Sequence, residues 1–283
     1  MILFQSMSSV TICSIVTVAI LITLGTGRQP LAAAYSFIKS LVVSRKYLLF
    51  FIAVLAIMVI NKYELKMEQW LNISYDLTPA LSGWEGTWPA WLQTTFHSNI
   101  LTAVCAFFYL VVFQSVMIAS LAIYTHKRDM KLYYAFCIAL LINYFLAVPF
   151  YLFVPVNEVW FVHSQVKFLM LDAFPTFEKD YRSLSGINNC FPSLHTSISV
   201  TMALLASRSG IRRWSIFAWS NAVIIIFSIF YLGIHWFTDM VAGVALALFA
   251  VTVGLKVGEW AERSSKIGQL SRTKLKASRP VGS

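Results

Sequence analysis

Charged residues are scarce in this chain. Only 12% of its 283 residues are Asp, Glu, Lys or Arg, whereas 58% are hydrophobic and the mean hydropathy is +0.71. Soluble globular domains carry about twice that fraction of charge. The composition therefore excludes an ordinary soluble domain. It predicts an all-α polytopic membrane bundle, because helices satisfy their own backbone hydrogen bonds in lipid.

Cysteine is also rare, and its four occurrences are scattered. Cys13, Cys105 and Cys137 fall within apolar segments, and Cys190 lies in a polar connection. The sequence contains no CxxC pair, so it offers neither a disulfide framework nor a paired zinc-ligand motif.

Apolar runs of the length that a membrane span requires are present along the whole chain. A span needs roughly 17 to 25 apolar residues. The first predicted span has no basic residue before Arg28, which indicates an uncleaved anchor with its amino end outside. The sequence predicts about seven spans, of which the second and fifth are short: 8–26, 47–61, 98–123, 132–154, 191–207, 214–234 and 240–258.

Basic and acidic residues are divided between alternate connections. Of the 22 Lys and Arg, 17 lie in 27–46, 124–131, 208–213 and the tail after 255, with three of the 12 acidic residues. The positive-inside rule places these connections and the carboxyl terminus in the cytoplasm. The long connections 62–97 and 155–190 are then outside. This distribution explains the net charge of +10 without nucleic-acid binding.

The segment FPSLH, residues 191–195, places polar residues where a predicted span begins. Proline is tolerated in the first turn of a helix, and the free N–H groups beside the Ser193 hydroxyl favour a phosphate. His195, one turn further in, is positioned to protonate a leaving oxygen. The alternative is that Ser193 only caps the helix and His195 is a satisfied polar residue in the bundle.

A second polar pair, His235 and Asp239, follows the predicted sixth span. If these residues are helical, their spacing places both side chains on one face. The carboxylate would then fix the imidazole tautomer and leave the other ring nitrogen free as a nucleophile or base. The alternative is a charge and a histidine capping the next span, and a metal site would lack a third ligand of suitable spacing. Because the fifth span runs inward and the sixth outward, His195 and His235 should share one outer pocket.

Together these elements resemble the type 2 phosphatidic acid phosphatase (PAP2) superfamily, through FPSLH and through FSIFYLGIHWFTDMVAG, residues 227–243. The resemblance implies a six-helix catalytic core over 47–258, which leaves 1–46 as an added helix and cytoplasmic connection. The basic residues of 259–283 themselves predict a flexible cytoplasmic tail on anionic headgroups. It also implies that His235 forms a phosphohistidine, that Asp239 orients it, that His195 protonates the leaving group and that Ser193 binds phosphate. Neither a metal nor another cofactor is implied.

Two basic positions of the family pattern are missing. Ile229 stands where plain phosphatases of the family have an arginine, and the region 147–161, AVPFYLFVPVNEVWF, lacks their first signature. In this respect the chain is more similar to the branch that includes inositol phosphorylceramide synthases. A phosphate in a low-dielectric site needs countercharge. The candidates are residues of the second outer connection: Arg182, Lys179 and Lys167 for phosphate, and Asn157 with Glu158 for an alcohol acceptor or headgroup. The alternative for each basic residue is an interfacial charge.

The sequence thus predicts a metal-independent phosphatase or phosphotransferase that acts on a phospholipid or polyprenyl (di)phosphate at the extracytoplasmic face. Its partners would be a lipid phosphate, membrane lipids and, for a transferase, an alcohol or sugar acceptor. The acceptor and the oligomeric state are not encoded in any pattern that we recognise. A different class stays open: a non-catalytic multi-span transporter or receptor with a degenerate core of this type.

Overall fold

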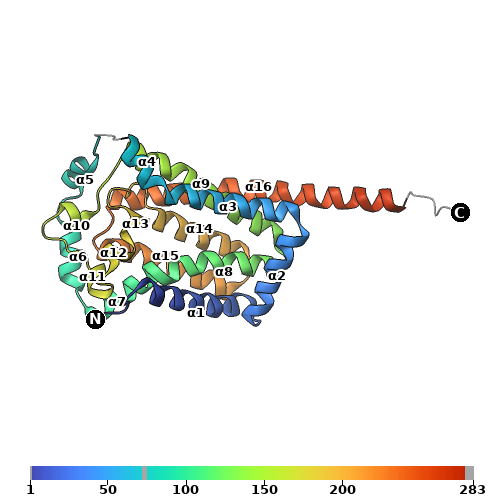
Figure 1. Ribbon diagram of the computed structural model, residues 1–283, viewed down its shortest axis with the longest axis horizontal. Helices are drawn as coiled ribbons and strands as arrows, with labels where there is room; N and C mark the ends of the chain where they lie inside the picture. Colours follow the sequence, from blue (N-terminus) through green and yellow to red (C-terminus); the bar gives the residue numbers. More distant parts are fainter. Residues whose placement is uncertain (1, 72–74, 278–283) are drawn as a thin grey trace.

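Helices form nearly all the regular structure of this protein. The computed structural model describes residues 2–71 and 75–277, without the side chains of 183, 184 and 265–277. Within these residues the one β-type pairing is an isolated bridge between Val156 and Asn189. The predicted all-α polytopic bundle is therefore confirmed (Figure 1).

Every predicted span corresponds to a helix. One of these helices is interrupted, because α7 continues through a π-helical turn, η1, into α8. The bounds are α1 (Met7–Thr26), α3 (Arg45–Lys62), α7 (Asn99–Phe107), η1 (Phe108–Val112), α8 (Phe113–His126), α9 (Met130–Phe153), α14 (Leu194–Arg208), α15 (Arg212–Tyr231) and α16 (Phe237–Ala277).

The lengths of these helices limit how many of them can cross a membrane. Within the described residues, five helices are long and apolar enough to cross a membrane, or up to six if the bent pair α2 and α3 counts as one span. Helix α14 has 15 residues, fewer than the roughly 17 that a span needs. The predicted count of seven therefore stays a prediction.

Two segments expected to connect or follow the spans contain helical structure that the sequence did not indicate. The connection 27–46 contains a helix, α2 (Pro30–Val43), which begins with a proline and is bent by 106° from α3. Ser44 separates the two because its side chain caps α3, accepting from the Tyr47 N–H. The tail expected to be flexible from 259 onward instead continues α16 as far as Ala277. Its sequence holds no proline before Pro280, so nothing in that stretch forces the helix to end.

The two long connections gather at one end of the bundle. The first contains α4 (Glu64–Leu71), α5 (Thr78–Glu85) and α6 (Trp88–Phe96), and the second contains α10 (Val159–Val162), α11 (Met170–Ala173), α12 (Phe177–Asp180) and α13 (Arg182–Ser185). The amino terminus lies at the same end, whereas α2 and the end of α16 lie at the other (Figure 1). We call the end of the bundle that carries the two long connections and the amino terminus the loop end.

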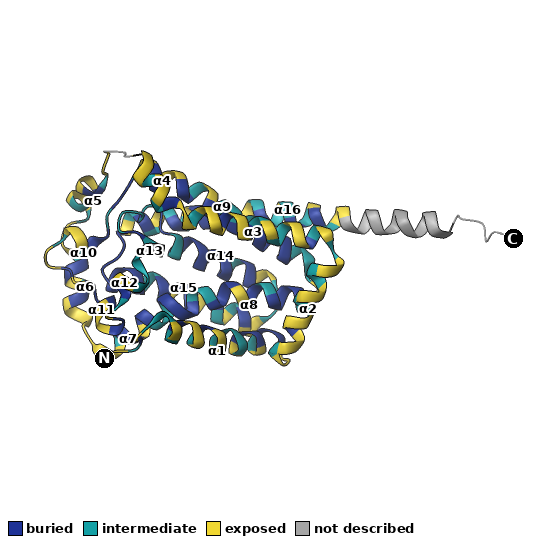
Figure 2. Ribbon diagram, viewed as in Figure 1, coloured by how far each residue is buried: buried dark blue, intermediate teal, exposed yellow. Residues whose placement is uncertain are grey.

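Helix α14 occupies the centre of the bundle. It contacts α8, α9, α15 and α16, and residues 196–203 are buried without interruption (Figure 2). Two of its buried hydroxyls, those of Ser197 and Thr201, are hydrogen-bonded to Asn143 of α9, whereas Thr196 Oγ1 and Ser199 Oγ have no partner among the described residues. A short polar helix is accommodated here because other helices surround it and supply some of its partners.

Candidate active site

Ser193 fixes the start of α14. Its Oγ accepts a hydrogen bond from the Thr196 N–H at 3.3 Å, and its own N–H donates to the Asp239 carbonyl at 3.1 Å. The side chain is buried and is not among the described residues that line the cavity of His195 and His235. Its observed contact is thus that of a helix N-cap, and its role as a phosphate ligand stays a prediction.

His235 lies in the short loop between α15 and α16, and not inside a helix as its spacing from Asp239 suggested. The loop turns at Gly233, whose φ is +82°, and a Cβ there would lie 2.7 Å from the Lys167 carbonyl. Only glycine fits both conditions easily. The N–H groups of Ile234 and His235 then both donate to the Ile229 carbonyl, which closes the end of α15.

Asp239 joins His235 to the start of α16. Its Oδ2 lies 3.2 Å from His235 Nδ1 and accepts from the Trp236 N–H at 2.9 Å. The contact with the Trp236 N–H caps the start of α16, and the contact with Nδ1 has the geometry that the orienting role requires, while the role itself stays a prediction. With Asp239 ionised, Nδ1 carries the ring proton and Nε2 keeps a free electron pair.

The two motifs meet because α14 and α16 approach closely. A Cβ on Gly243 would lie 2.6 Å from the Ser193 carbonyl and 3.0 Å from Thr196 Cβ. A larger residue at this position would push the start of α14 away from α16. The hydrogen bond from the Ser193 N–H to the Asp239 carbonyl depends on the same approach.

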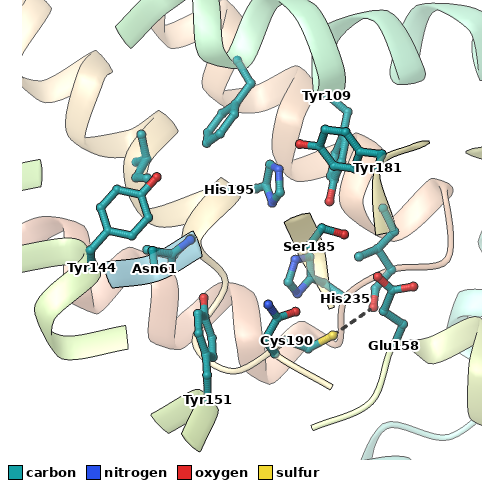
Figure 3. Close-up of a pocket in the computed structure, with 15 residues that line it drawn as sticks. Asn61, Tyr109, Tyr144, Tyr151, Glu158, Tyr181, Ser185, Cys190, His195 and His235 are labelled. Carbon is teal, nitrogen blue, oxygen red and sulfur yellow. Dashed lines mark hydrogen bonds between the residues drawn. The ribbon is translucent and has the colours of Figure 1, made fainter. Parts of the chain in front are cut away.

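His195 and His235 line one cavity of about 150 Å³ at the loop end (Figure 3). Their ring centroids are 6.2 Å apart and the rings are inclined by 58°. A nucleophilic nitrogen approaches phosphorus to about 3–3.5 Å, and an acid reaches the leaving oxygen at about 2.6–3.2 Å. The separation of the two rings is thus compatible with one phosphoryl group between them.

The π-helical turn η1 supplies an aromatic wall for His195. Tyr109 stacks on the imidazole with centroids 4.0 Å apart and an interplanar angle of 20°, and Phe113 lies at 4.6 Å and 38°. Such turns often occur at functional sites because the extra residue changes where side chains point. No sequence pattern had indicated this turn or either aromatic residue.

The rest of the cavity is lined with hydroxyl and amide groups. In the view of Figure 3, Tyr144 and Tyr151 lie on one side of the two histidines, and Tyr109 and Tyr181 lie on the other. Asn61 and Asn189 also contribute. Among the described residues that line this cavity, none is Lys or Arg, so its wall offers neutral hydrogen-bond donors to an anion.

Arg182 is paired with carboxylates beside the cavity and does not line it. Its Nη1 contacts Glu158 Oε1 at 2.8 Å, and its Nη2 contacts Glu178 Oε1 at 2.7 Å. Burial works to lower the pKa of Arg182, but Glu178 and Glu158 together raise it above its ordinary value. Glu158 does line the cavity, and burial raises its pKa despite the opposing effect of Arg182. The role of Arg182 as a phosphate countercharge stays a prediction, and it requires the guanidinium to give up its contact with Glu158 or Glu178.

The other predicted ligands lie outside the cavity. Lys167 and Lys179 are exposed on the second long connection. Asn157 receives hydrogen bonds on its carbonyl from Trp236 Nε1 at 2.9 Å, and its own N–H donates to Thr78 Oγ1 at 2.8 Å. Asn157 therefore steadies the loop that carries His235, and its contact with a substrate stays a prediction.

Two acidic residues missed from sequence hold the site together. Glu85 accepts from the N–H groups of Phe237 and Thr238 at 2.6 and 2.7 Å, which satisfies the start of α16. Glu64 of α4 accepts from the Asn189 side chain at 3.4 Å, and burial raises the pKa of Glu64 to about 7. Neither residue belongs to a motif in the sequence, and only the scarcity of acidic residues in the chain could have drawn attention to them.

The comparison with protein families gives one match. The profile of the PAP2 superfamily matches residues 82–253, which include η1, FPSLH and the segment from Gly233 to Gly243. No curated protein and no solved structure matches the chain. Because the match covers more than half of the chain and both histidines of the cavity, this protein belongs to the PAP2 superfamily.

Proposed function

We propose that this protein is a membrane-embedded lipid phosphatase or phosphotransferase that works through a phosphohistidine at His235. Membership of the PAP2 superfamily supports a phosphatase-like action on lipid phosphates in general. The observation that carries the finer proposal is the cavity in which the His195 and His235 rings lie 6.2 Å apart, with Asp239 behind His235.

In the first step, Nε2 of His235 attacks phosphorus and forms a P–N bond. The bond from phosphorus to the leaving oxygen breaks, and its electron pair stays on that oxygen. Protonated His195 donates a proton there. Asp239 stabilises the cation that develops on His235 through Nδ1–H, and stacking on Tyr109 holds the His195 ring in position.

In the second step, neutral His195 accepts a proton from an incoming hydroxyl group. The hydroxyl oxygen attacks phosphorus, the P–N bond breaks, and His235 regains its electron pair. Water gives a phosphatase, and a sugar, inositol or lipid hydroxyl gives a phosphotransferase. Neither step uses a metal ion or a cofactor.

The phosphate oxygens would be held by the asparagine groups of the wall and by its tyrosine hydroxyl groups other than that of Tyr109, whose ring stacks on His195. Arg182, 2.8 Å from Glu158, is the nearest basic candidate for additional countercharge, with Lys179 and Lys167 further along the same connection. Two substrate classes suit a site at the end of an apolar bundle: phospholipids and polyprenyl (di)phosphates. We place this end outside the cytoplasm because the opposite connections hold most of the basic residues.

The experiment is to incubate purified protein with radiolabelled phosphatidic acid, polyprenyl diphosphate and phosphatidylinositol, with and without candidate alcohols, in excess chelator. Label should appear in inorganic phosphate or in a new lipid, and a phosphoenzyme that is labile to acid should accumulate transiently. His235→Ala should abolish both. Turnover by His235→Ala at the wild-type rate would refute the proposal, as would a strict requirement for a divalent cation. Absence of turnover with every lipid would favour the non-catalytic alternative.

A further inference from the structure

Cys190 lies beside the proposed nucleophile. It directly precedes FPSLH, is 1% exposed, and lines the same cavity as His235. Its N–H donates to the Val156 carbonyl at 3.2 Å, which fixes its backbone. Its thiol lies 3.6 Å from the Ile234 carbonyl, next to the loop that carries His235. The thiol also lies 3.9 Å from the Ile187 carbonyl, so it is held in place by two long and therefore weak hydrogen bonds.

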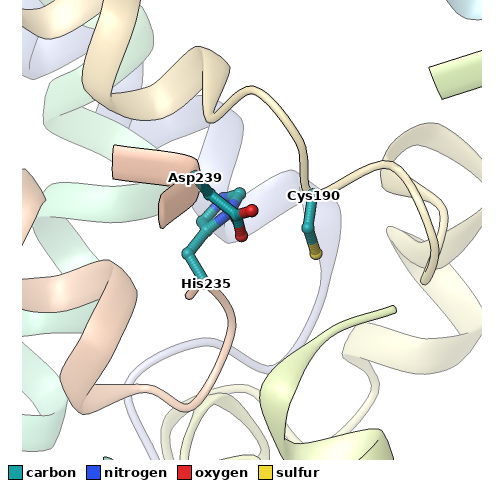
Figure 4. A group of neighbouring side chains, drawn as sticks. All are labelled: Cys190, His235 and Asp239. Atoms are coloured by element: carbon teal, nitrogen blue, oxygen red, sulfur yellow. The ribbon is translucent and has the colours of Figure 1, made fainter. Parts of the chain in front are cut away.

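Three potential metal-ligand groups converge here. One ligand atom each from Cys190, His235 and Asp239 lies within 4.8 Å of the others, and all three residues are buried (Figure 4). A tetrahedral zinc ion binds sulfur at about 2.3 Å and nitrogen or oxygen at about 2.0–2.2 Å, so its ligands are roughly 3.3–3.7 Å apart. His235 Nδ1 and Asp239 Oδ2, at 3.2 Å, already have this separation. The sulfur needs to approach by about 1 Å at most.

A second observation indicates that this group has unused binding capacity. Asp239 is 0% exposed, yet its Oδ1 has no hydrogen-bond partner among the described residues. A buried carboxylate oxygen without a partner is costly and is uncommon in native proteins. A cation bound between Asp239, His235 and Cys190 would satisfy it.

We propose that Cys190, His235 and Asp239 form an inhibitory site for a thiophilic divalent cation such as Zn²⁺ or Cd²⁺. A thiolate, an imidazole and a carboxylate favour these ions over Mg²⁺ or Ca²⁺, which prefer oxygen ligands. Binding releases the thiol proton of Cys190. If the ion takes Nδ1 of His235, the ring proton moves to Nε2, and if it takes Nε2 it occupies that atom directly. In either case His235 loses the electron pair that attacks phosphorus.

The binding test does not depend on the proposed function. Purified protein is titrated with Cd²⁺, and the ultraviolet charge-transfer band from sulfur to cadmium is recorded for wild type, Cys190→Ser and Cys105→Ser. Cys105 is the matched control because it is equally buried, in α7. Wild type and Cys105→Ser should bind one ion with the band, and Cys190→Ser should lose it. Zn²⁺ affinity, measured by calorimetric titration because Cys190→Ser lacks the band, should be lower by at least about tenfold in Cys190→Ser than in wild type.

Asp239→Asn provides an independent arm in case Cys190→Ser does not fold. It keeps the thiol but removes the charged ligand, so its Cd²⁺ affinity should fall by at least about tenfold. Wild-type affinity and an unchanged band in either variant would overturn the proposed site. Absence of the band in wild type would overturn it as well.

The inhibition arm rests on the proposed function. Zn²⁺ should inhibit lipid-phosphate turnover by wild type and Cys105→Ser, and chelator should reverse this. Cys190→Ser, measured against its own metal-free rate, should need at least about ten times more Zn²⁺. Equal sensitivity of Cys190→Ser would overturn inhibition through this site. If no variant turns over lipid, the proposed function fails while the Cd²⁺ titration still decides whether the site exists.

Discussion

Two cavities in this bundle differ in size and in chemistry, and the smaller one holds the reactive groups. The cavity at the loop end has a volume of about 150 Å³ and is lined by both histidines, four tyrosines and two asparagines. The other has a volume of about 470 Å³ and lies between α1, α2, α3, α8 and α9. Gln114 is its one polar lining residue, and the Gln114 amide already donates to Ser14 and Leu110. Volume therefore does not locate the site, whereas convergent polar groups do.

The two cavities also differ in which parts of the chain enclose them. Helices α1, α2 and α3, which border the apolar cavity, precede the region 82–253 that matches the PAP2 superfamily. The polar cavity is enclosed mainly by η1, α9, α14 and the loops within that region. We therefore expect substitutions around the polar cavity to change the chemistry and substitutions around the apolar cavity to leave it nearly unchanged.

The largest contrast should come from Asp239→Asn. Losing the carboxylate removes the group that fixes the His235 tautomer, and the turnover number should fall by about 10⁴-fold. The matched control is Glu259→Gln, which alters an exposed acid paired with Lys131 on the far part of α16. Its turnover should stay close to wild type. Similar losses in both variants would show that general damage to α16, and not the site, controls the rate.

His195→Ala should have the next largest effect. Removing a general acid should slow turnover by about 10²–10⁴-fold on a lipid phosphate with an alkoxide leaving group. A substrate with a nitrophenol leaving group needs little protonation, so its first step should lose much less. This difference is measured as phosphoenzyme formation in a rapid-quench experiment. An equal loss with both leaving groups would contradict the role of His195 as an acid.

Tyr109 should have an intermediate effect through its stacking on His195. Tyr109→Ala removes a ring contact worth about 1–2 kcal/mol when it faces a cation, so turnover should fall by roughly tenfold. Tyr109→Phe retains the ring and should stay within about threefold of wild type. If stacking matters through His195, the loss in Tyr109→Ala should shrink with the nitrophenol substrate. An equal loss in Tyr109→Phe would assign the effect to the hydroxyl group instead.

The smallest effect should come from filling the apolar cavity. Ala122→Val adds two methyl groups to its wall, and the volume of the cavity leaves room for them. Turnover should change by less than about twofold and thermal stability should change little, because overpacking costs arise only where space is lacking. A loss of more than about tenfold in turnover at unchanged stability would show that this cavity takes part in substrate binding, and the contrast between the cavities would no longer hold.

Much of the fold could be predicted because an apolar run is recognised from neighbouring residues alone, without knowledge of tertiary contacts. Each predicted span contains a helix, and the predicted start at 98 and end at 207 lie within one residue of the start of α7 and the end of α14. Two helical features were not predicted: α2 forms in a segment expected to be a connection, and α16 extends beyond the predicted end of the last span at 258. Neither segment is apolar throughout, so a search for membrane spans does not detect their helical structure.

The candidate site was predicted in part for a similar reason. His195, His235 and Asp239 belong to short motifs, which can be recognised without knowing what they contact. The contacts of Tyr109 and Glu85 could not be recognised, because these residues come from other parts of the chain. Cys190 directly precedes FPSLH, but its approach to His235 and Asp239 depends on the packing of α14 against α16. Arg182, chosen from sequence for its charge, proves to be paired with Glu158 and Glu178.

The sequence by itself determined the apolar helices, the caps that begin them and the residues capable of phosphoryl chemistry. These properties depend on neighbouring residues along the chain, through hydropathy and local hydrogen bonds. Only the tertiary structure decided that His195 faces His235 across 6.2 Å and that Cys190 joins the same group. Those distances link segments about 40 residues apart and arise from the packing of α14 against α16, where Gly243 permits the close approach.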